Sequence, residues 1–528
     1  MDFKKLKSCS DVRGVALGEN TVLTPAVAET LGRAFVAYLS QKLSKKPEQL
    51  TVAVGRDSRL SGPQLLQAVL EGITSTGATA ADYEMCTTPA MYMAILTEGF
   101  QPDASIMITA SHLPFNRNGF KYFDRDGGLN KEDISRIIDC AQCENLDDHF
   151  DRPGCAENGS DAGAGNDGCD KSAPEAGSKT GSVHKKDLIA RYAAHLREKI
   201  IAEVARPDVP DKPLAGLKIV VDAGNGAGGF YAEQILAPLG ADVSASQFLD
   251  PDGHFPNHQP NPENKEAMES ISRRVVESGA DFGLIFDTDV DRSSAVDKNG
   301  REISRNAIVA MAAALIAVEH PGTTVVTDSI TSDELTVYLE DCLGLKHLRF
   351  KRGYKNVINK SIALNKEGID SQLAIETSGH AAYKENYFLD DGAYLATKIV
   401  IKAAQLAQQG VGIDVLLASL AEPKEALEVR FPISGEDFAA YGEQVLADLK
   451  TWASAPEQAA RGFSLVEPNY EGVRLNVRNA DTTGWCLLRK SLHDPIMPLN
   501  VEVSQGSCEN ILNEIKDFLR KYTQIVVK

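Results

Sequence analysis

The sequence has no long apolar run, and no apolar segment follows its first residues. The longest apolar stretch, residues 307–318, is too short to span a bilayer and is followed by Glu319 and His320. The first five residues include two lysines and no apolar segment, so we expect no secretory signal. These absences predict a protein with no membrane partner. We expect it in the cytoplasm, or in an organelle if a transit peptide has been removed.

Positive charge is also scarce. The chain has 55 Lys and Arg against 74 Asp and Glu, a formal net charge of −19. Such an acidic chain is a poor general binder of nucleic-acid phosphates, so we expect no nucleic-acid partner. The apolar content of 43% is ample for several hydrophobic cores. The length of 528 residues predicts roughly three or four domains.

Cysteine motifs are almost absent. Nine cysteines are scattered along the chain, and one Cys-x-x-Cys pair occurs, Cys140 and Cys143. This pair ends a helical pattern over 131–143 rather than following a strand, and no second pair completes a zinc site. We therefore expect reduced, unligated thiols, as in a reducing compartment.

Short apolar runs alternate with amphipathic stretches through most of the chain. The runs cover residues 50–54, 106–110, 217–221, 282–286, 323–326 and 373–375. This alternation predicts α/β layers, in which functional side chains lie at the ends of strands. Segment 152–182 breaks the pattern, because it is rich in Gly, Ala, Ser, Asp and Asn and has little to bury. It predicts a flexible insertion or linker.

Three carboxylates stand at alternate positions directly after the run 282–286. They are Asp287, Asp289 and Asp291. Three like charges this close need a cation to coexist. An EF-hand loop does not fit, because Arg292 stands where that loop requires glycine. The pattern favours a Mg²⁺ ion with open positions, and a solvated acidic turn is the alternative.

Ser111 follows the buried-looking run 106–110. A serine at the tip of such a strand is well placed as a nucleophile or a phosphoryl carrier. Lys121, ten residues further on, suits a charge partner or a proton donor for phosphate chemistry. The absence of a Gly-x-Ser-x-Gly elbow disfavours a hydrolase serine. An ordinary strand-to-loop serine remains the alternative.

A third polar group follows the run that ends at Ile375. Glu376 and Ser378 can together hold a pair of vicinal hydroxyls, such as a sugar presents. His380 can transfer a proton near neutral pH. A polar surface turn is an equally good interpretation of this segment alone.

A glycine-rich turn suggests a different class of protein. Residues 224–229 follow a strand and fit Gly-x-Gly-x-x-Gly, with Asp250 roughly where a ribose-binding acid stands in dinucleotide enzymes. The next segment, 252–262, is however a proline-broken loop rather than the next helix of a dinucleotide-binding unit. A dinucleotide enzyme is therefore the disfavoured alternative.

In their order and spacing, these motifs closely resemble the α-D-phosphohexomutase superfamily, which includes phosphoglucomutases, phosphomannomutases and phosphoglucosamine mutases. The segments that carry the resemblance are Thr-Ala-Ser-His at 109–112, Asn-Gly-Phe-Lys at 118–121, Asp-Gly-His-Phe-Pro at 252–256, Asp-Thr-Asp-Val-Asp-Arg at 287–292 and Glu-Thr-Ser-Gly-His at 376–380. The resemblance runs from about Asp11 into the C-terminal domain and is interrupted by 152–182.

The resemblance implies an α/β fold of four domains around a central cleft, three related α/β domains and a smaller C-terminal α+β domain. The implied parts are a phosphoserine-bearing domain (1–150), the flexible insertion (151–183), a metal-binding domain (184–298), a sugar-binding domain (299–422) and a C-terminal phosphate-binding domain (423–528).

The resemblance also implies a role for each matching residue. Ser111 matches the active-site phosphoserine, which completes a Mg²⁺ site with Asp287, Asp289 and Asp291. Arg13 and Arg292 match active-site arginines, and Lys121 and His380 match residues proposed for acid/base work. Sugar and phosphate contacts are matched by Glu376, Ser378, Gly353, Lys355, Arg489 and Ser491.

The implied activity is that of a Mg²⁺-dependent phosphosugar mutase. It would interconvert hexose 1-phosphate and hexose 6-phosphate, of glucose and/or mannose, through a phosphoserine enzyme. A hexose 1,6-bisphosphate would be both the intermediate and the activator, and the partner is a small-molecule phosphosugar.

Two segments depart from the family pattern. Residues 489–495 read Arg-Lys-Ser-Leu-His-Asp-Pro where Arg-Pro-Ser-Gly-Thr-Glu-Pro is usual, and His493 is a further candidate for holding a phosphate. Thr288 and Val290 stand in the metal loop where glycines are more usual. These departures keep three alternatives open: a hexose-1,6-bisphosphate-forming enzyme, a phosphoglucosamine mutase, and a non-catalytic sugar-phosphate-binding relative.

Overall fold

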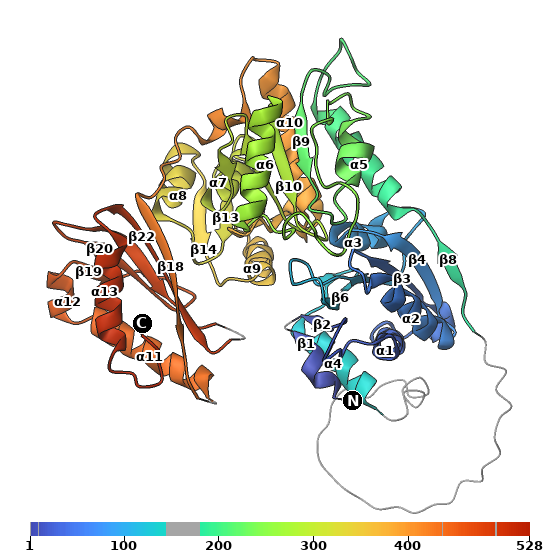
Figure 1. Cartoon of the computed structure of the whole chain (residues 1–528), viewed down its shortest axis with the longest axis horizontal. Coiled ribbons are helices and arrows are strands. Elements are labelled where there is room, and N and C mark those ends of the chain that lie inside the picture. The colour runs from blue at the N-terminus through green and yellow to red at the C-terminus, as the bar shows by residue number, and fades with distance from the viewer. Residues whose placement is uncertain (1, 9, 144–179, 436, 492–493, 528) are drawn as a thin grey trace, which may run out of the picture. The chain divides into compact units, whose positions relative to one another are not determined.

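The computed structural model describes residues 2–8, 10–143, 180–435, 437–491 and 494–527 (Figure 1). The described chain forms two compact units. The first unit comprises Met1–Arg301 and Asp391–Gln409, and the second comprises Glu302–Asp390 and Gly410–Lys528. The predicted insertion at 151–183 lies outside the described residues except for its last four.

The first unit begins with a mixed sheet. Its strands, in spatial order, are β1 (Lys7–Ser8), β2 (Asp11–Val15), β6 (Arg117–Asp124), β5 (Ala104–Ile108), β3 (Thr51–Arg56), β4 (Thr79–Met85) and β8 (Val183–Lys185), and β7 (Gly127–Gly128) pairs with β6. Strand β3 is parallel to both β4 and β5, and β8 is parallel to β4. The carboxyl ends of these strands therefore share one edge, where Ser111 follows β5.

Helices cover both faces of this sheet. They are η1 (Phe3–Leu6), α1 (Pro25–Leu43), η2 (Pro47–Gln49), α2 (Gly62–Ser75), α3 (Thr88–Leu96) and α4 (Lys131–Gln142). One core joins α1, α2 and α4 to alternate strand residues such as Val52 and Ile106. On the opposite face, the Ser105 hydroxyl donates to the Met91 carbonyl of α3 at 2.8 Å. Alternate side chains of β5 thus face different helices.

The first unit continues with a smaller layer. It contains α5 (Leu188–Glu203), β9 (Ile219–Asp222), the π-helical turn η4 (Tyr231–Leu236), α6 (Lys265–Ser278), β10 (Phe282–Phe286) and β11 (Ser293–Asp297). Strand β10 lies parallel to β9 and antiparallel to β11. The acidic segment 287–292 is therefore the turn of the β10–β11 hairpin.

Helix α10 (Gly392–Ala407) packs in the first unit, although the sequence places it in the sugar-binding domain. The Tyr192 hydroxyl of α5 donates to Asp391, which caps α10, at 2.6 Å, and the Tyr231 and Thr397 hydroxyls lie 3.0 Å apart. The Gly392 N–H donates to the Val290 carbonyl of the acidic hairpin at 3.1 Å. A distant segment of the chain thus supports this hairpin.

The second unit holds a third α/β layer. Its sheet has the order β14 (Lys346–Arg349), β13 (Thr324–Thr327), β15 (Leu373–Ile375), β16 (Ala381–Tyr383), β17 (Leu389–Asp390). The helices α7 (Asn306–Ala314), α8 (Asp333–Val337), η5 (Tyr338–Cys342), α9 (Tyr354–Lys366), η6 (Lys384–Asn386) and η7 (Ile413–Leu417) complete it. The short strand β12 (Glu302–Ile303) instead belongs to the sheet of β9, β10 and β11. Strands β14 and β15 both lie parallel to β13, so their carboxyl ends share an edge near Glu376.

The C-terminal part of the second unit is an antiparallel sheet with helices. Its strand order is β18 (Glu425–Pro432), β22 (Ile496–Gln505), β21 (Thr483–Leu488), β20 (Val473–Arg478), β19 (Phe463–Leu465). The helices are α11 (Phe438–Ala453), α12 (Pro456–Ala460) and α13 (Cys508–Leu519). One core joins this sheet to α11 and α13, through residues such as Leu449, Leu475 and Ile515.

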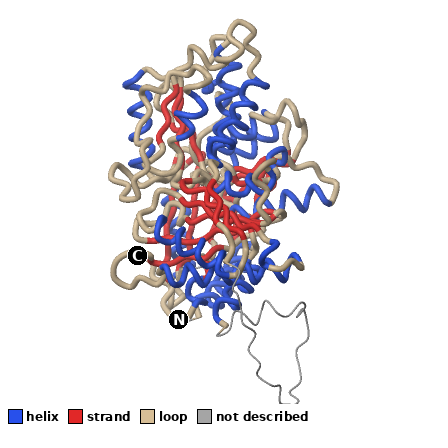
Figure 2. Tube along the Cα trace, turned by 90° about the vertical axis from the view of Figure 1, so that its right-hand side faces the viewer, coloured by secondary structure: helices blue, strands red, loops and turns tan. Residues whose placement is uncertain are grey.

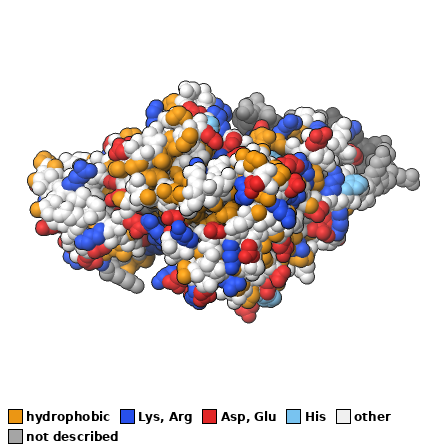
Figure 3. Space-filling view, turned by 90° about the horizontal axis from the view of Figure 1, so that it is seen from above, with side chains coloured by type: hydrophobic (Ala, Val, Ile, Leu, Met, Phe, Trp, Pro, Cys, Tyr) orange, Lys and Arg blue, Asp and Glu red, His pale blue; other side chains and the backbone are white. Residues whose placement is uncertain are grey.

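The predicted α/β class is therefore confirmed, with three α/β layers and a C-terminal α+β region. Figure 2 shows how much of the described chain is helix and strand. Among the described residues, no helix combines the length and the apolar character needed to cross a membrane. Cys140 is buried and Cys143 exposed, and within the described residues neither takes part in a disulfide. Acidic and basic side chains are interspersed on the face shown in Figure 3, so the charge of −19 is not gathered there into one acidic field.

Candidate active site

Ser111 stands at the end of a buried strand in an unusual backbone conformation. Its φ angle is 50°, in the left-handed region that residues with side chains rarely adopt, and only 4% of the residue is exposed. Its N–H donates to the Thr109 hydroxyl at 2.8 Å. Backbone conformations of this kind persist only where surrounding contacts hold them, and they gather at functional sites.

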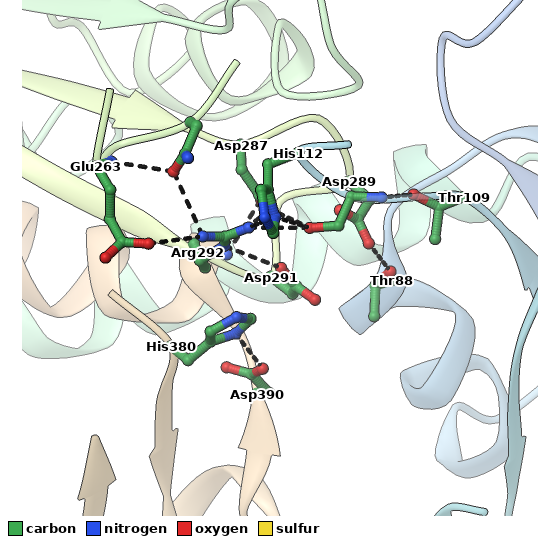
Figure 4. Close-up of polar contacts among 12 residues, drawn as sticks. Thr88, Thr109, His112, Glu263, Asp287, Asp289, Asp291, Arg292, His380 and Asp390 are labelled. Carbon is green, nitrogen blue, oxygen red and sulfur yellow. Dashed lines mark hydrogen bonds and ion pairs between the residues drawn. The ribbon is translucent and has the colours of Figure 1, made fainter. Parts of the chain in front are cut away.

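The three predicted metal ligands lie close together in the β10–β11 hairpin (Figure 4). One oxygen from each of Asp287, Asp289 and Asp291 lies within 4.8 Å of the others, and all three residues are buried. Val290 between them has a φ of 64°. A glycine is the usual residue for such a conformation, so this departure from the family pattern falls where glycine is favoured.

The structure brings Ser111 to this hairpin. The Ser111 hydroxyl donates to Asp287 Oδ2 at 2.9 Å, and Arg292 Nη2 donates to Ser111 Oγ at 3.1 Å. Arg292 Nε also donates to Asp287 Oδ2 at 3.2 Å. The nucleophile, a carboxylate and a guanidinium from two motifs far apart in the sequence thus share one site.

The donor set fits a divalent cation. Lys121 Nζ donates to Asp289 Oδ2 at 2.8 Å and also contacts Asp291, and the Thr88 hydroxyl donates to Asp289. Within the described residues, Asp289 Oδ1 is buried and has no hydrogen-bond partner. Three carboxylates against the two cations Lys121 and Arg292 leave a net negative site of hard oxygen atoms, which is what Mg²⁺ prefers.

Arg292 is almost fully buried, at 2% exposure. Burial disfavours its charged form, but the nearby carboxylates, Asp287 foremost, outweigh that effect and raise the pKa of Arg292. The side chain therefore stays cationic beside Ser111. A fixed positive charge at this position suits a phosphoryl group carried by the serine.

The loop 252–262 supports both motifs. Gln259 Nε2 donates to the His112 carbonyl at 2.6 Å, and Asn261 Oδ1 accepts from Arg292 Nη1 at 3.4 Å. His258 Nε2 contacts Asp222 at 3.0 Å. Burial lowers the pKa of His258, but the hydrogen bond to Asp222 outweighs it and raises the pKa. The loop therefore holds the serine segment and the acidic hairpin together.

Arg13, the remaining predicted residue of this unit, lies in β2 and is only partly buried. Its guanidinium pairs with Asp11 at 2.9 Å. The sequence reasoning missed two other residues, Asp57 and Arg59, which are fully buried beside the Ser111 loop. Burial raises the pKa of Asp57 to about 6. Their one sequence signal is the polar turn after β3, the parallel neighbour of the strand that ends before Ser111.

The second unit gathers the predicted sugar-binding residues at the end of β15. Glu376 and Ser378 are buried, and Glu376 Oε1 accepts the Gly353 N–H at 2.7 Å. Gly353 has a φ of 108° and begins α9, whose first turn contains Lys355. Burial and the neighbouring Asp328 raise the pKa of Glu376 to about 7.

His380 is held from two sides. Its Nδ1 contacts Asp390 Oδ2 (Figure 4). Its ring also stacks on Tyr354, with centroids 5.2 Å apart and an interplanar angle of 22°. When a carboxylate binds one ring nitrogen of a histidine, that hydrogen bond fixes the tautomer and so the protonation of the other nitrogen. This arrangement suits a group that donates or accepts a proton.

Asp328 and Arg352 lie beside Glu376, and the sequence did not predict either of them as a site residue. Asp328 Oδ2 accepts the Thr377 hydroxyl at 2.8 Å and lies 3.5 Å from Arg352 Nε. Asp328 is fully buried, and burial raises its pKa. Two carboxylates, Asp328 and Glu376, thus share one buried site with one arginine.

The predicted phosphate loop of the C-terminal region is described in part. Arg489 is 9% exposed, and its Nε atom has no hydrogen-bond partner within the described residues. Burial lowers the pKa of Arg489. The Ser491 hydroxyl accepts the Asp494 N–H at 3.2 Å. Leu492 and His493, the altered part of the motif, lie outside the described residues.

The glycine-rich turn 224–229 is filled by the protein itself. A Cβ atom on Gly226 would lie 2.8 Å from the Thr288 carbonyl oxygen, and one on Gly229 would lie 2.3 Å from the Leu249 carbonyl oxygen. These glycines allow close packing of the acidic hairpin and a neighbouring segment. They do not line a space for a pyrophosphate, which argues further against the dinucleotide alternative.

Comparison with known proteins identifies the family of the chain. Family models described as phosphoglucomutase/phosphomannomutase, alpha/beta/alpha domains I, II and III, match residues 4–146, 190–300 and 304–422. The chain is 28% identical to a phosphomannomutase/phosphoglucomutase of Pseudomonas syringae pv. tomato over 516 residues, 97% of this chain and 94% of that protein. It is 31% identical to a phosphoglucomutase/phosphomannomutase of Thermococcus kodakarensis over 400 residues, 75% of this chain and 76% of that protein.

A solved structure is also similar over nearly the whole chain. The crystal structure of a phosphoglucomutase/phosphomannomutase family protein from Burkholderia thailandensis matches with a TM-score of 0.75 and 26% identity, covering 99% of this chain and 98% of that chain. The chain belongs to the phosphoglucomutase/phosphomannomutase family of the α-D-phosphohexomutase superfamily. The resemblance seen in the sequence is thereby confirmed, and the protein is a phosphohexomutase, an isomerase of carbohydrate metabolism.

Proposed function

We propose that this phosphohexomutase is Mg²⁺-dependent and interconverts the 1-phosphate and 6-phosphate of a hexose, glucose and/or mannose, with Ser111 as the phosphoryl carrier. The observation that carries the proposal is the position of Ser111 Oγ, 2.9 Å from Asp287 Oδ2 and 3.1 Å from Arg292 Nη2. A cytoplasmic location is part of the proposal.

The first unit supplies groups for phosphoryl transfer. Asp287, Asp289 and Asp291 would hold Mg²⁺, which when bound neutralises charge on the phosphoryl group. Arg292 donates to the Ser111 oxygen and stays cationic, so it would stabilise the phosphoryl group during transfer. Lys121 would stabilise charge or deliver a proton to the sugar oxygen.

The second unit supplies groups for sugar recognition. Glu376 and Ser378 would hold a pair of sugar hydroxyls, and His380, fixed by Asp390, would transfer a proton. Arg489 has an Nε atom without a hydrogen-bond partner within the described residues, so it is suited to a substrate phosphate. Gly353, Lys355 and Ser491 would add contacts to the ligand, and Arg13 would contact it from the first unit.

The reaction then proceeds in two transfers. Phosphoserine 111 passes its phosphoryl group to a free sugar hydroxyl, which loses a proton to a neighbouring base, and a hexose 1,6-bisphosphate forms. The bisphosphate turns end for end, and its other phosphoryl group passes to Ser111. The Ser111 hydroxyl gives up its proton and the sugar oxygen that is left takes one up, so phosphoserine 111 is regenerated and the isomeric monophosphate is released. Added hexose 1,6-bisphosphate would activate the enzyme because it phosphorylates any unmodified Ser111.

A substrate panel tests the proposal. Phosphates of glucose, mannose and glucosamine are each incubated with the protein, Mg²⁺ and glucose 1,6-bisphosphate as primer, and intact mass records the phosphoryl group on the protein. We expect glucose or mannose phosphate to isomerise. Ser111→Ala should take up no phosphoryl group and lose at least about a thousandfold in kcat.

Four outcomes would contradict the proposal. Turnover retained by Ser111→Ala would exclude the serine as carrier. A phosphorylated protein that isomerises none of the sugars would support a non-catalytic relative. Accumulation of bisphosphate without isomerisation would support a bisphosphate-forming enzyme, and a strict preference for glucosamine phosphate would indicate a phosphoglucosamine mutase.

A further inference from the structure

Arg59 is a fully buried cation whose guanidinium points into the loop that carries Ser111. Its relative exposure is 0%. Nη1 donates to the carbonyls of Pro114 at 2.8 Å and Arg117 at 3.0 Å. Nη2 donates to the carbonyl of Leu113 at 2.6 Å and to that of Ser111 itself. One side chain thus binds four carbonyl groups of a single loop.

A second set of hydrogen bonds joins Ser111 to the turn formed by Asp57–Arg59. Arg59 Nε lies 3.3 Å from Asp57 Oδ2, and Asp57 Oδ1 accepts the Arg59 N–H at 3.0 Å. The Thr109 hydroxyl donates to Asp57 Oδ2 at 2.7 Å and accepts the Ser111 N–H at 2.8 Å. Both backbone groups of Ser111, its N–H and its carbonyl, are therefore bound by this Asp57–Arg59 turn, directly or through Thr109.

Residues of the loop 252–262 pack against Arg59 and its neighbour Leu60. The Arg59 guanidinium carbon lies 5.5 Å from the centre of the Phe255 ring, and a Cβ on Gly253 would lie 2.5 Å from the Leu60 nitrogen. Arg59 thus lies where the Ser111 loop and the loop 252–262 meet. Burying a charge at such a junction costs free energy, which the contacts of that charge must offset.

We infer that Arg59 is a positioning residue for the nucleophile, because its fork of donors holds Ser111 in the left-handed conformation that directs Oγ to Asp287 and Arg292. This inference rests on the proposed function, in which Ser111 carries the phosphoryl group. A lysine in place of Arg59 keeps the charge but presents its three donors from a single nitrogen instead of a planar fork, so it cannot bind all four carbonyls. The serine would then sample other conformations and lose its alignment.

The test compares phosphoryl transfer in four variants. Arg59→Lys removes the fork, and Thr109→Val removes the hydroxyl between Ser111 and Asp57 at almost constant volume. Thr109→Ser restores that hydroxyl. Arg274→Lys is the control, because Arg274 Nε likewise donates to a backbone carbonyl of this unit, that of Ala245 at 2.7 Å. Each protein is assayed for kcat, KM, unfolding temperature and the rate at which glucose 1,6-bisphosphate phosphorylates Ser111.

We expect Arg59→Lys and Thr109→Val to lower kcat and the phosphorylation rate together, by roughly tenfold to a hundredfold, because a small misalignment of a nucleophile has effects of this size. KM should stay within about threefold of the wild-type value, since the sugar contacts are unchanged. Thr109→Ser should recover most of the kcat, and Arg274→Lys should keep the wild-type kcat.

A purely structural role predicts a different result. The unfolding temperature of Arg59→Lys and Thr109→Val would fall, while kcat per folded molecule stayed at the wild-type value, and that result would overturn the inference. Failure of Arg59→Lys to fold leaves the Thr109 pair as the decisive comparison. Failure of the proposed function is distinguishable, because the wild-type protein itself would then take up no phosphoryl group from glucose 1,6-bisphosphate.

Discussion

The carboxylates around Ser111 each contact a buried cation, whereas the two carboxylates around Glu376 share a single arginine. Around Ser111, the cations Lys121 and Arg292 contact the carboxylates of the acidic hairpin. Around Glu376, a second carboxylate, that of Asp328, is buried close by and both pKa values are raised. Arg489 likewise keeps a buried Nε atom without a hydrogen-bond partner within the described residues.

This difference follows from what each site must do. A site that transfers a phosphoryl group needs its charges fixed before the reaction, because reorganising them during the reaction costs energy. A site that recognises a sugar phosphate gains affinity from groups that the ligand satisfies on binding. Under the proposed function, the strand-end edge of a parallel sheet would thus serve preorganised chemistry in one unit and ligand recognition in the other.

The largest effect should come from the carboxylate cluster. Asp289→Asn removes one anionic ligand while keeping the size of the side chain. We expect weaker Mg²⁺ binding and a loss of roughly a thousandfold in kcat, because the metal would neutralise the transferring charge. Metal binding by calorimetry, measured beside kcat, checks this. A variant with normal Mg²⁺ affinity and normal kcat would show that the hairpin is a solvated acidic turn.

The second unit should respond through KM. Glu376→Gln removes a carboxylate that would accept sugar hydroxyls, so KM should rise by roughly tenfold while the phosphorylation of Ser111 by excess glucose 1,6-bisphosphate continues. An equal loss of kcat and of phosphorylation at saturating ligand would remove the contrast between the two units.

The pH dependence of KM should report the protonation of the same residue, Glu376. The pKa of Glu376 is raised from 4.5 to about 7, so the carboxylate is ionised above that pH and neutral below it. KM of the wild-type protein should therefore rise as pH falls through about 7, and KM of Glu376→Gln should not. Because the folded state disfavours the ionised form, Glu376→Gln should gain unfolding temperature relative to wild type as pH rises from 5 to 8, by about a few degrees.

The smallest effect should come from Val290 in the acidic hairpin. Val290→Gly relieves the left-handed backbone, worth about 1–2 kcal/mol, but removes a buried side chain worth about the same. The free energy of unfolding should therefore change by less than about 1 kcal/mol, whereas Val290→Ala, which keeps the strain and loses packing, should cost about 1–2 kcal/mol. Chemical denaturation measures both. A larger loss for glycine than for alanine would contradict this account of the loop.

Much of the site was predictable because its chemistry follows short apolar runs. Strand β10 covers the predicted run 282–286, and Ser111 and Glu376 also follow buried strands, as the alternation of apolar and polar segments indicates. Glycine patterns were less informative. The turn 224–229 matches a dinucleotide motif, yet its glycines make room for the protein's own backbone.

Other parts of the site had only a weak local signal, a polar turn after a strand. Arg59 and Asp328 are charged residues in ordinary polar turns, and nothing in their neighbourhoods in the sequence indicates full burial. The sequence predicts helix α10 as part of the sugar-binding domain, but the helix belongs to the first unit. There Gly392 contacts the backbone of Arg292. Contacts between residues so far apart in the chain depend on how complete layers pack.

The sequence by itself determined which residues can do the chemistry, because the periodicity of apolar residues places the serine, the carboxylates and the sugar-binding turn at strand ends. Only the tertiary structure decided which of them meet. Ser111 and Asp287 are 176 residues apart and lie 2.9 Å from each other through their oxygen atoms. Their meeting depends on the packing of two separate layers and on the loop between them. The backbone of Ser111 lies in the left-handed region, and its carbonyl accepts a hydrogen bond from the buried Arg59.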